Sequence, residues 1–239
     1  TITYNLDGGT NHPSNPTTYT VNTPTITLQN PTKAGYNFVG WYTAPTEGSK
    51  VETIPQGSTE NITLYARWEE IGYALTFNPN YITVKRNGIT LTSGTTVYKD
   101  QVLVITYNRL GYESATILVN GIPLVGNEYI VGIEDVVITV TDEVEITYTI
   151  TYNLDGGTNH PSNPTTYTVN TPTITLQNPT KAGYNFVGWY TAPTEGSKVE
   201  TIPQGSTENI TLYAVWEEVT YTITYNLDGG TNHPSNPTT

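Results

Sequence analysis

The sequence predicts a mainly β fold, built as a tandem array of small units with little helix. Residues 1–70 read the same as residues 149–218 except at one position, where Arg67 is replaced by Val215. Short segments of alternating apolar and polar residues recur between turns rich in Gly, Pro and Asn, as is typical of strands. Charged residues make up only 13% of the chain, while Thr, Asn and Tyr are abundant, which favours strands over helices.

The repeats divide the chain into four segments. The first copy, unit A, occupies residues 1–70, and the second, unit A′, occupies residues 149–220. Residues 71–148 form unit B, which has a different sequence, and residues 221–239 form the truncated start of a third A unit. Self-similarity at a fixed offset is typical of repeat arrays, and units of about 70 residues are expected to lean on their neighbours. The chain has no Met, so we expect it to be part of a longer protein.

Each A-type unit is organised around an aromatic segment, Lys33–Tyr42 in A and Lys181–Tyr190 in A′. Strict strand alternation would place Phe38 and Trp41 on opposite faces, with both faces covered. A bulge at Gly40 would instead turn Trp41 towards Phe38, and the sequence leaves both possibilities open. We expect the tryptophan to be buried in either case, because a small core depends on its largest side chains.

The segments around this one complete the predicted unit. Residues 1–6 and 62–68 alternate as half-buried strands that open and close A. Residues 17–28 predict one bent strand or two short ones, and residues 43–59 hold too many Pro and Gly for a long helix. The single difference between the copies, at Arg67, lies on the outer face of the closing strand, where substitutions are tolerated.

Unit B is also predicted to consist of strands. Asn87-Gly88 and Asn120-Gly121 each separate two apolar segments, which is a strong β-hairpin signal. Residues 101–107 are apolar on both faces and predict a central strand.

Three motifs of A, repeated in A′, carry a resemblance to a known family: Asn5–Gly9, Pro31–Tyr42 and Ile62–Trp68. Together they resemble the Listeria–Bacteroides repeat, the B repeat of internalin-type surface proteins. Unit B, with Gly111-Tyr112 and Val119–Gly121, resembles a divergent form of the same repeat.

The resemblance implies a small β-grasp-like (ubiquitin-like) unit. It also implies a bacterial protein that is extracellular, attached to the cell surface or cell wall, in which tandem repeats form a stalk or an adhesive, protein-binding region. No catalytic residues accompany the family, so we expect no enzyme activity and no cofactor.

The titratable residues show no spacing that suits catalysis or metal binding. The three histidines are one residue of the same Asn-His-Pro loop seen three times, His12, His160 and His233, and the chain has no Cys. The loop at Asp7 lacks the alternating acids of a calcium site, so a β-turn is expected. Adjacent carboxylates such as Glu69 and Glu70 point to opposite faces of a strand and do not converge as an acid–base pair must.

Composition limits the partners. The net charge is −12 and no basic stripe is present, which excludes a nucleic-acid binder. No run of 18 apolar residues occurs, so we expect no membrane insertion within these residues. The expected partner is a host or bacterial surface protein or a glycan.

Two alternatives stay open at this point. A carbohydrate-binding module would use exposed aromatic rings, and Trp41, Tyr42, Trp189 and Tyr190 could stack on sugars. Because the tryptophans are expected in the core, Tyr42 and Tyr190 are the weak candidates for ligand binding. A self-formed Lys–Asn isopeptide crosslink, of the kind found in some bacterial surface stalks, would require Lys33 to lie beside a buried Asn and an acid.

The start of the third copy holds one predicted strand, Thr222–Leu227, and nothing to cover it. A lone strand leaves its apolar face and its backbone groups unpaired. We therefore expect this strand to pair with an exposed strand edge, either on A′ or on a neighbouring molecule by strand exchange between identical repeats.

Overall fold

The computed structural model describes residues 1–238, and the regular structure of that range consists of β-strands with no helix. The mainly β prediction is therefore confirmed. The chain divides into two compact units: one comprises Thr1–Arg109 with Ala115–Asp142, and the other comprises Leu110–Ser114 with the chain from Glu143 onwards. Units A and B have their hydrophobic cores in the first, and A′ has its core in the second.

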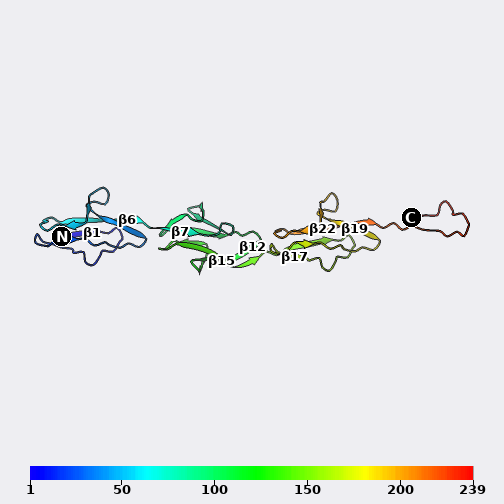
Figure 1. Cartoon of the computed structure of the whole chain (residues 1–239), viewed down its shortest axis with the longest axis horizontal. Helices are drawn as coiled ribbons and strands as arrows, with labels where there is room; N and C mark the ends of the chain where they lie inside the picture. The colour runs from blue at the N-terminus through cyan, green and yellow to red at the C-terminus, as the bar shows by residue number, and fades with distance from the viewer. Residues whose placement is uncertain (239) are drawn as a thin grey trace. The chain divides into compact units, whose positions relative to one another are not determined.

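In unit A the first strand and the last strand pair in parallel. They lie side by side (Figure 1), with Ile2 opposite Ile62 and Asn5 opposite Tyr65. The last strand also pairs with the aromatic strand, so these two are the inner strands of the sheet β1-β6-β3-β4. The strands of A are β1 (Ile2–Asn5), β2 (Ile26–Thr27), β3 (Tyr36–Tyr42), β4 (Lys50–Val51), β5 (Thr53–Ile54) and β6 (Ile62–Glu70).

A β-bulge in β3 decides how the aromatic side chains are arranged. The register with β6 shifts between Phe38 and Gly40, so that Phe38 faces Trp68 while Trp41 faces Ala66. The extra residue turns Trp41 towards Phe38, and their ring centroids lie 5.4 Å apart in an edge-to-face contact. Of the two possibilities that the sequence left open, the structure therefore has the bulge.

Trp41 fills the core of A, as predicted, with 2% of its surface exposed. Its indole N–H donates to the carbonyl of Gln29 at 3.1 Å, which satisfies the polar edge of the buried ring. The second tryptophan of the unit, Trp68, donates in the same way to Leu6 at 3.0 Å. A side chain at Gly9 would meet the ring of Trp68 at 2.6 Å, so this turn requires a glycine.

A buried asparagine holds the loop between β1 and β2 against the core. The side-chain amide of Asn15 donates to Asn11 at 2.8 Å and to the carbonyl of Gln29 at 2.9 Å. Its carbonyl oxygen accepts the backbone N–H of Gln29 at 2.8 Å. Every polar group of this side chain is thus paired, which removes the usual cost of burying an amide.

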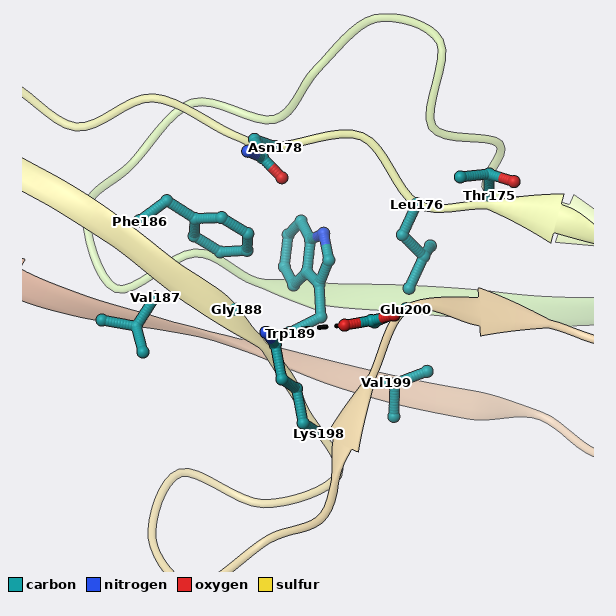
Figure 2. A pocket seen from close by; sticks show the side chains of 10 residues that line it. All are labelled: Thr175, Leu176, Asn178, Phe186, Val187, Gly188, Trp189, Lys198, Val199 and Glu200. Atoms are coloured by element: carbon teal, nitrogen blue, oxygen red, sulfur yellow. Dashed lines mark ion pairs between the residues drawn. The ribbon is translucent and has the colours of Figure 1, made fainter.

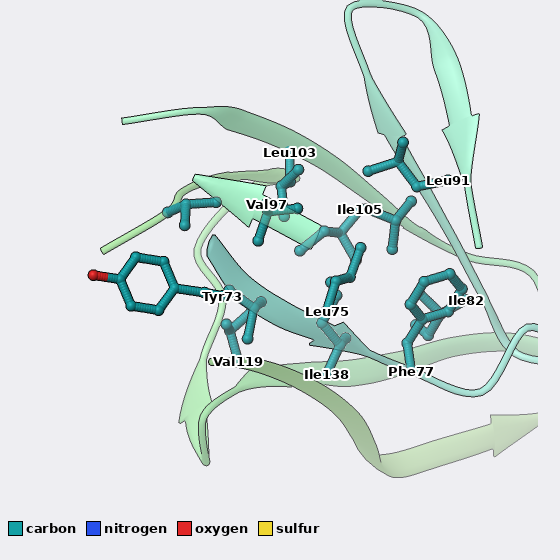
Figure 3. Close-up of a cluster of buried hydrophobic side chains, with 13 residues drawn as sticks. Tyr73, Leu75, Phe77, Ile82, Leu91, Val97, Leu103, Ile105, Val119 and Ile138 are labelled. Carbon is teal, nitrogen blue, oxygen red and sulfur yellow. The ribbon is translucent and has the colours of Figure 1, made fainter. Parts of the chain in front are cut away.

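Unit B contains a larger core between two sheets, shown in Figure 3. Both predicted hairpins are confirmed, since Asn87 and Asn120 and the glycines after them all have positive φ, as a type I′ turn requires. Its strands are β7 (Gly72–Thr76), β8 (Ile82–Arg86), β9 (Ile89–Leu91), β10 (Thr96–Tyr98), β11 (Val102–Tyr107), β12 (Tyr112–Val119), β13 (Ile122–Pro123), β14 (Glu128–Ile130) and β15 (Val136–Glu145).

The strand β11 is central, as predicted, because it pairs with β8 on one side and β14 on the other. Although both of its faces are apolar in sequence, only one of them is buried. Leu103 and Ile105 are buried, whereas Val102 is 41% exposed. One face of this sheet therefore remains open to solvent, which antiparallel sheets allow and parallel sheets rarely do.

Unit A′ repeats the arrangement of A. Its sheet has the order β17-β16-β22-β19-β20, with β16 parallel to β22, and the register shift recurs between Phe186 and Gly188. Trp189 is 2% exposed, as Trp41 is. Its strands are β16 (Tyr148–Asn153), β17 (Thr166–Tyr167), β18 (Ile174–Thr175), β19 (Tyr184–Tyr190), β20 (Lys198–Val199), β21 (Thr201–Ile202) and β22 (Ile210–Glu218).

The start of the third copy keeps only its local bonds. Ile223 N–H donates to Thr238 at 3.0 Å and Tyr225 hydroxyl donates to Pro237 at 3.0 Å, as the equivalent groups do in A. No strand is formed by residues 219–238, and Ile223 and Leu227 are 43% and 39% exposed. The expected pairing of 222–227 with A′ is therefore not formed, because nothing replaces the closing strand. Strand exchange between molecules stays a prediction, and Thr239 lies outside the described residues.

We predict that Trp41→Ala destabilises A by about 3–5 kcal/mol, the usual cost of emptying an aromatic core site. Amide exchange of β6, measured by hydrogen–deuterium exchange and mass spectrometry on the whole chain, should accelerate in the variant. The equivalent strand β22 is the internal control, because it differs from β6 only in carrying Val215 in place of Arg67, and its peptides therefore differ in mass. Unchanged exchange of β6 would mean that the indole does not hold this core together.

We also predict that A′ loses stability at high pH through Tyr152. Burial raises the pKa of Tyr152 to about 12, from a value of about 10 in an unfolded chain. Below pH 10 the phenol is protonated in the folded and the unfolded state, so its full contribution to the free energy of unfolding is present. Between pH 10 and about 12 only the unfolded state ionises, so the contribution is lost as pH rises.

Urea unfolding at pH 9 and pH 11 measures this loss, which should be smaller in Tyr152→Phe than in the parent. Tyr221, which is 68% exposed, provides the control. Tyr221→Phe should lose as much stability as the parent over the same interval. Equal losses in all three proteins would contradict the assignment to Tyr152.

Candidate functional site

The two tyrosines singled out as ligand candidates end the aromatic strands on the face opposite the core. Tyr42 pairs across the sheet with Tyr65, while the neighbouring Trp41 points inward. Tyr42 and Tyr190 are both half-buried. The structure therefore places the tryptophans in the core, as expected, and leaves only the tyrosines on the outer surface.

In unit A the ring of Tyr42 is covered by a guanidinium group. The Cζ atom of Arg67 lies 3.8 Å from the ring centroid, in a cation–π contact. The Nη2 atom of Arg67 donates to the carbonyls of Ala44 and Glu47 at 3.1 and 2.9 Å. One side chain thus joins β6, the end of β3 and the loop that follows β3.

Unit A′ cannot form this contact, because Val215 replaces the arginine. Sequence reasoning placed this difference on the tolerant outer face, which is where it lies, but missed the stacking. The signal was present in the register: Arg67 lies opposite Gly40, which has no side chain to fill the space beside Tyr42. Tyr42 and Tyr190 are therefore not equivalent surfaces, although their surrounding sequences agree.

A groove lies on the other side of the aromatic strand of A′, beside Trp189 (Figure 2). It encloses about 300 Å³. The indole N–H of Trp189 is committed to the carbonyl of Gln177 at 3.1 Å. The charged residues of the groove, Lys198 and Glu200, pair at 3.6 Å, and each side chain is at least half exposed. An exposed ion pair of this kind contributes little free energy. The groove also offers no buried polar group to orient a ligand.

Lys33 is held by its neighbours in a way that does not match the crosslink hypothesis. Its Nζ atom lies 3.1 Å from the carboxylate of Asp7 and 4.3 Å from the ring centroid of Tyr36. The side chain of Asp7 is 76% exposed. The group beside the lysine is therefore a solvated carboxylate, whereas the buried Asn15 is fully bonded to other partners.

The histidine loop has a local structural role in each copy. The Nδ1 atom of His12 accepts the backbone N–H of Ser14 at 3.2 Å, and the same bond recurs at His160 and His233. Across residues 1–238 the structure brings together no group of three His, Asp or Glu side chains that could hold a metal ion. Asp7 has a positive φ of 46°, which fits the expected turn.

These features define the chain as a repeat protein whose described residues form strands and no helix. The sequence model of the Listeria-Bacteroides repeat domain matches residues 1–67 and 148–215, which is more than half of the chain. The chain belongs to this family, as the resemblance predicted.

Two relatives extend this result. A protein of Evansella cellulosilytica described as "Putative membrane protein" is 29% identical over 82% of this chain and 28% of its own length. Internalin H of Listeria monocytogenes is 36% identical over 38% of this chain and 16% of its own length. The chain thus spans less than a third of either relative. No solved structure matches it, and no helix within residues 1–238 has the length and apolar character to cross a membrane.

We predict that Arg67→Val loosens the loop after β3 in unit A. Losing this partly buried cation–π contact costs about 0.5–2 kcal/mol, and the carbonyls of Ala44 and Glu47 lose their donor. Amide exchange in residues 43–49 should rise to the level seen in residues 191–197 of A′. The reciprocal variant Val215→Arg should slow exchange in residues 191–197. If neither loop responds, the arginine does not anchor it.

Proposed function

We propose that this chain is a non-catalytic, extracellular repeat segment of a bacterial cell-surface protein. It acts as a stalk and provides surfaces for adhesion or protein–protein contact. The observation that carries the proposal is the repetition itself, since residues 1–70 and 149–218 differ in sequence only at Arg67 and Val215. Repeating a complete unit adds length and copies of one surface, which raises avidity without any new contact. The matches to the repeat family and to internalin H support it.

We further propose that units A, B and A′ are separate structural modules, that residues 221–239 are the truncated start of a further A unit, and that the A-type modules are β-grasp-like. In A′ the first and last strands are parallel neighbours at the centre of the sheet, and each is flanked by an antiparallel strand. This order supports the assignment. The connection that often holds a helix in such folds is here the stretch with the short strands β18, β20 and β21.

The partner that fits this surface is a protein or glycan on a host or bacterial cell. The outer face presents hydroxyl groups and half-buried rings, and Tyr190 is the ring without a stacked arginine. Aromatic rings with a polar edge are common contact groups at such interfaces. The net charge of −12 favours partners that carry positive charge.

Protease treatment of intact cells tests the location. Cells that express the full-length gene are exposed to an added protease and then probed with an antibody raised against this chain. We expect the signal to disappear from intact cells while a cytoplasmic control protein survives. Protection of the repeat until the cells are lysed would overturn the proposal.

A further inference from the structure

Unit A′ contacts the end of unit B through a joint in which a valine packs on a glycine. Gly111 has a φ of +83°, and a side chain built on it would meet Val169 at 2.6 Å. Beside this contact, the amide of Asn170 donates to the hydroxyl of Tyr112 at 2.7 Å and to the carboxylate of Glu145 at 2.6 Å. The joint therefore consists of a Val–Asn turn on one side and a Gly-Tyr turn with a glutamate on the other.

The Gly-Tyr side of this joint occurs at the end of all three units. In each, the first residue after the closing strand donates its N–H to the carbonyl of the glycine at 2.9 Å. At the end of A, the same position at Gly35 is covered by Lys99, whose side chain would lie 2.7 Å from an added Cβ. These backbone bonds run from Ile71 to Gly35, from Ile146 to Gly111 and from Val219 to Gly183.

At the end of A′ the same surface is built but carries nothing. A side chain added at Gly183, where φ is +79°, meets no atom within 4 Å. The hydroxyl of Tyr184 donates to Glu218 at 3.3 Å, so the two groups that would receive an asparagine amide are already adjacent. We call the surface formed by the glycine, the tyrosine after it and the glutamate that ends the closing strand a socket. Among residues 1–238, Lys99 covers the socket of A, Val169 covers that of B, and the socket of A′ is open.

The Val–Asn side exists in unit A in the same conformation. Thr20 N–H donates to the hydroxyl of Thr23 at 2.8 Å, and the docked turn of A′ has the equivalent bond at 2.9 Å. Val21 is 51% exposed. The turn is thus preformed whether or not it is docked, which lowers the entropic cost of docking.

We propose that Gly183, Tyr184 and Glu218 form a docking site for the Val–Asn turn of another A-type unit. When two copies of this chain meet in solution, the turn at Val21 and Asn22 of one copy binds at this site on the other. Val21 packs on Gly183 as Val169 packs on Gly111, and Asn22 donates to Tyr184 and Glu218. The proposal does not depend on the cellular role given above, because it concerns only how A-type units join.

Chemical crosslinking tests this, since the chain has no cysteine of its own. Two single variants, Gln56→Cys beside the turn and Glu217→Cys beside the open socket, are mixed with a bis-maleimide. One partner is isotopically labelled so that mixed dimers are counted by mass. The length of the bis-maleimide spacer is set with a double variant, Gln204→Cys with Val144→Cys. These two positions in the joint of B and A′ correspond to Gln56 and Glu217, so a spacer that links them within one chain has the right length.

We expect mixed dimers to form about tenfold faster than random collision allows, because docking raises the effective concentration of the two thiols. The matched control replaces Glu217→Cys with Glu69→Cys, which lies beside the socket of A that Lys99 fills. Equal rates in the two mixtures would overturn the proposal.

Two further variants test the contacts themselves. Gly183→Asn keeps the positive φ, which asparagine tolerates, but places a side chain where Val21 would pack. Asn22→Ala removes the amide donor. Each should reduce crosslinking to the rate of the Glu69 control while the thermal melt of the chain is unchanged. Fast crosslinking in both variants would show that the proposed contacts do not form.

Discussion

The placement of one tryptophan in the aromatic strand is the constraint on which each A-type unit depends. Trp41 contacts Phe38 and Tyr4 with ring centroids 5.4 and 5.1 Å apart, so it joins the first strand to the third. Its N–H reaches the carbonyl of Gln29, which Asn15 also binds, so the loop between β1 and β2 is tied to the same ring. Without the bulge before Gly40 the indole would lie on the outer face, and the unit would lose its largest buried side chain.

Most strands and hairpins of units A and B could be predicted from the sequence, because they depend on local patterns. Alternation identified the strands that open and close A, and Asn-Gly pairs identified both hairpins of B. The face of Trp41 could not be decided, because one inserted residue reverses every side chain beyond it and leaves little trace in composition. The cover of Tyr42 by Arg67 was missed for a related reason: the two residues are far apart in sequence and meet only through the register of β3 with β6.

The third copy shows which parts of the repeat form from short-range contacts and which require the rest of the unit. Residues 222–238 have the sequence of residues 1–17 and keep the hydrogen bonds that those residues make among themselves. They form no strand, and the isoleucine that is 4% exposed in A is 43% exposed here. The order of β1 in the complete unit therefore comes from β6, about sixty residues away, and not from its own sequence.

The parallel pairing of β1 with β6 has a mechanical consequence. The chain enters A at the start of β1 and leaves it at the end of β6, and these points lie at opposite ends of one ladder. A pull on the two ends slides the strands along each other, so all the hydrogen bonds of the ladder bear the force together. In a hairpin pulled from its adjacent ends, the bonds would break one after another. The same geometry recurs in the pairing of β16 with β22, so each A-type unit resists tension along the chain as a whole ladder and not bond by bond.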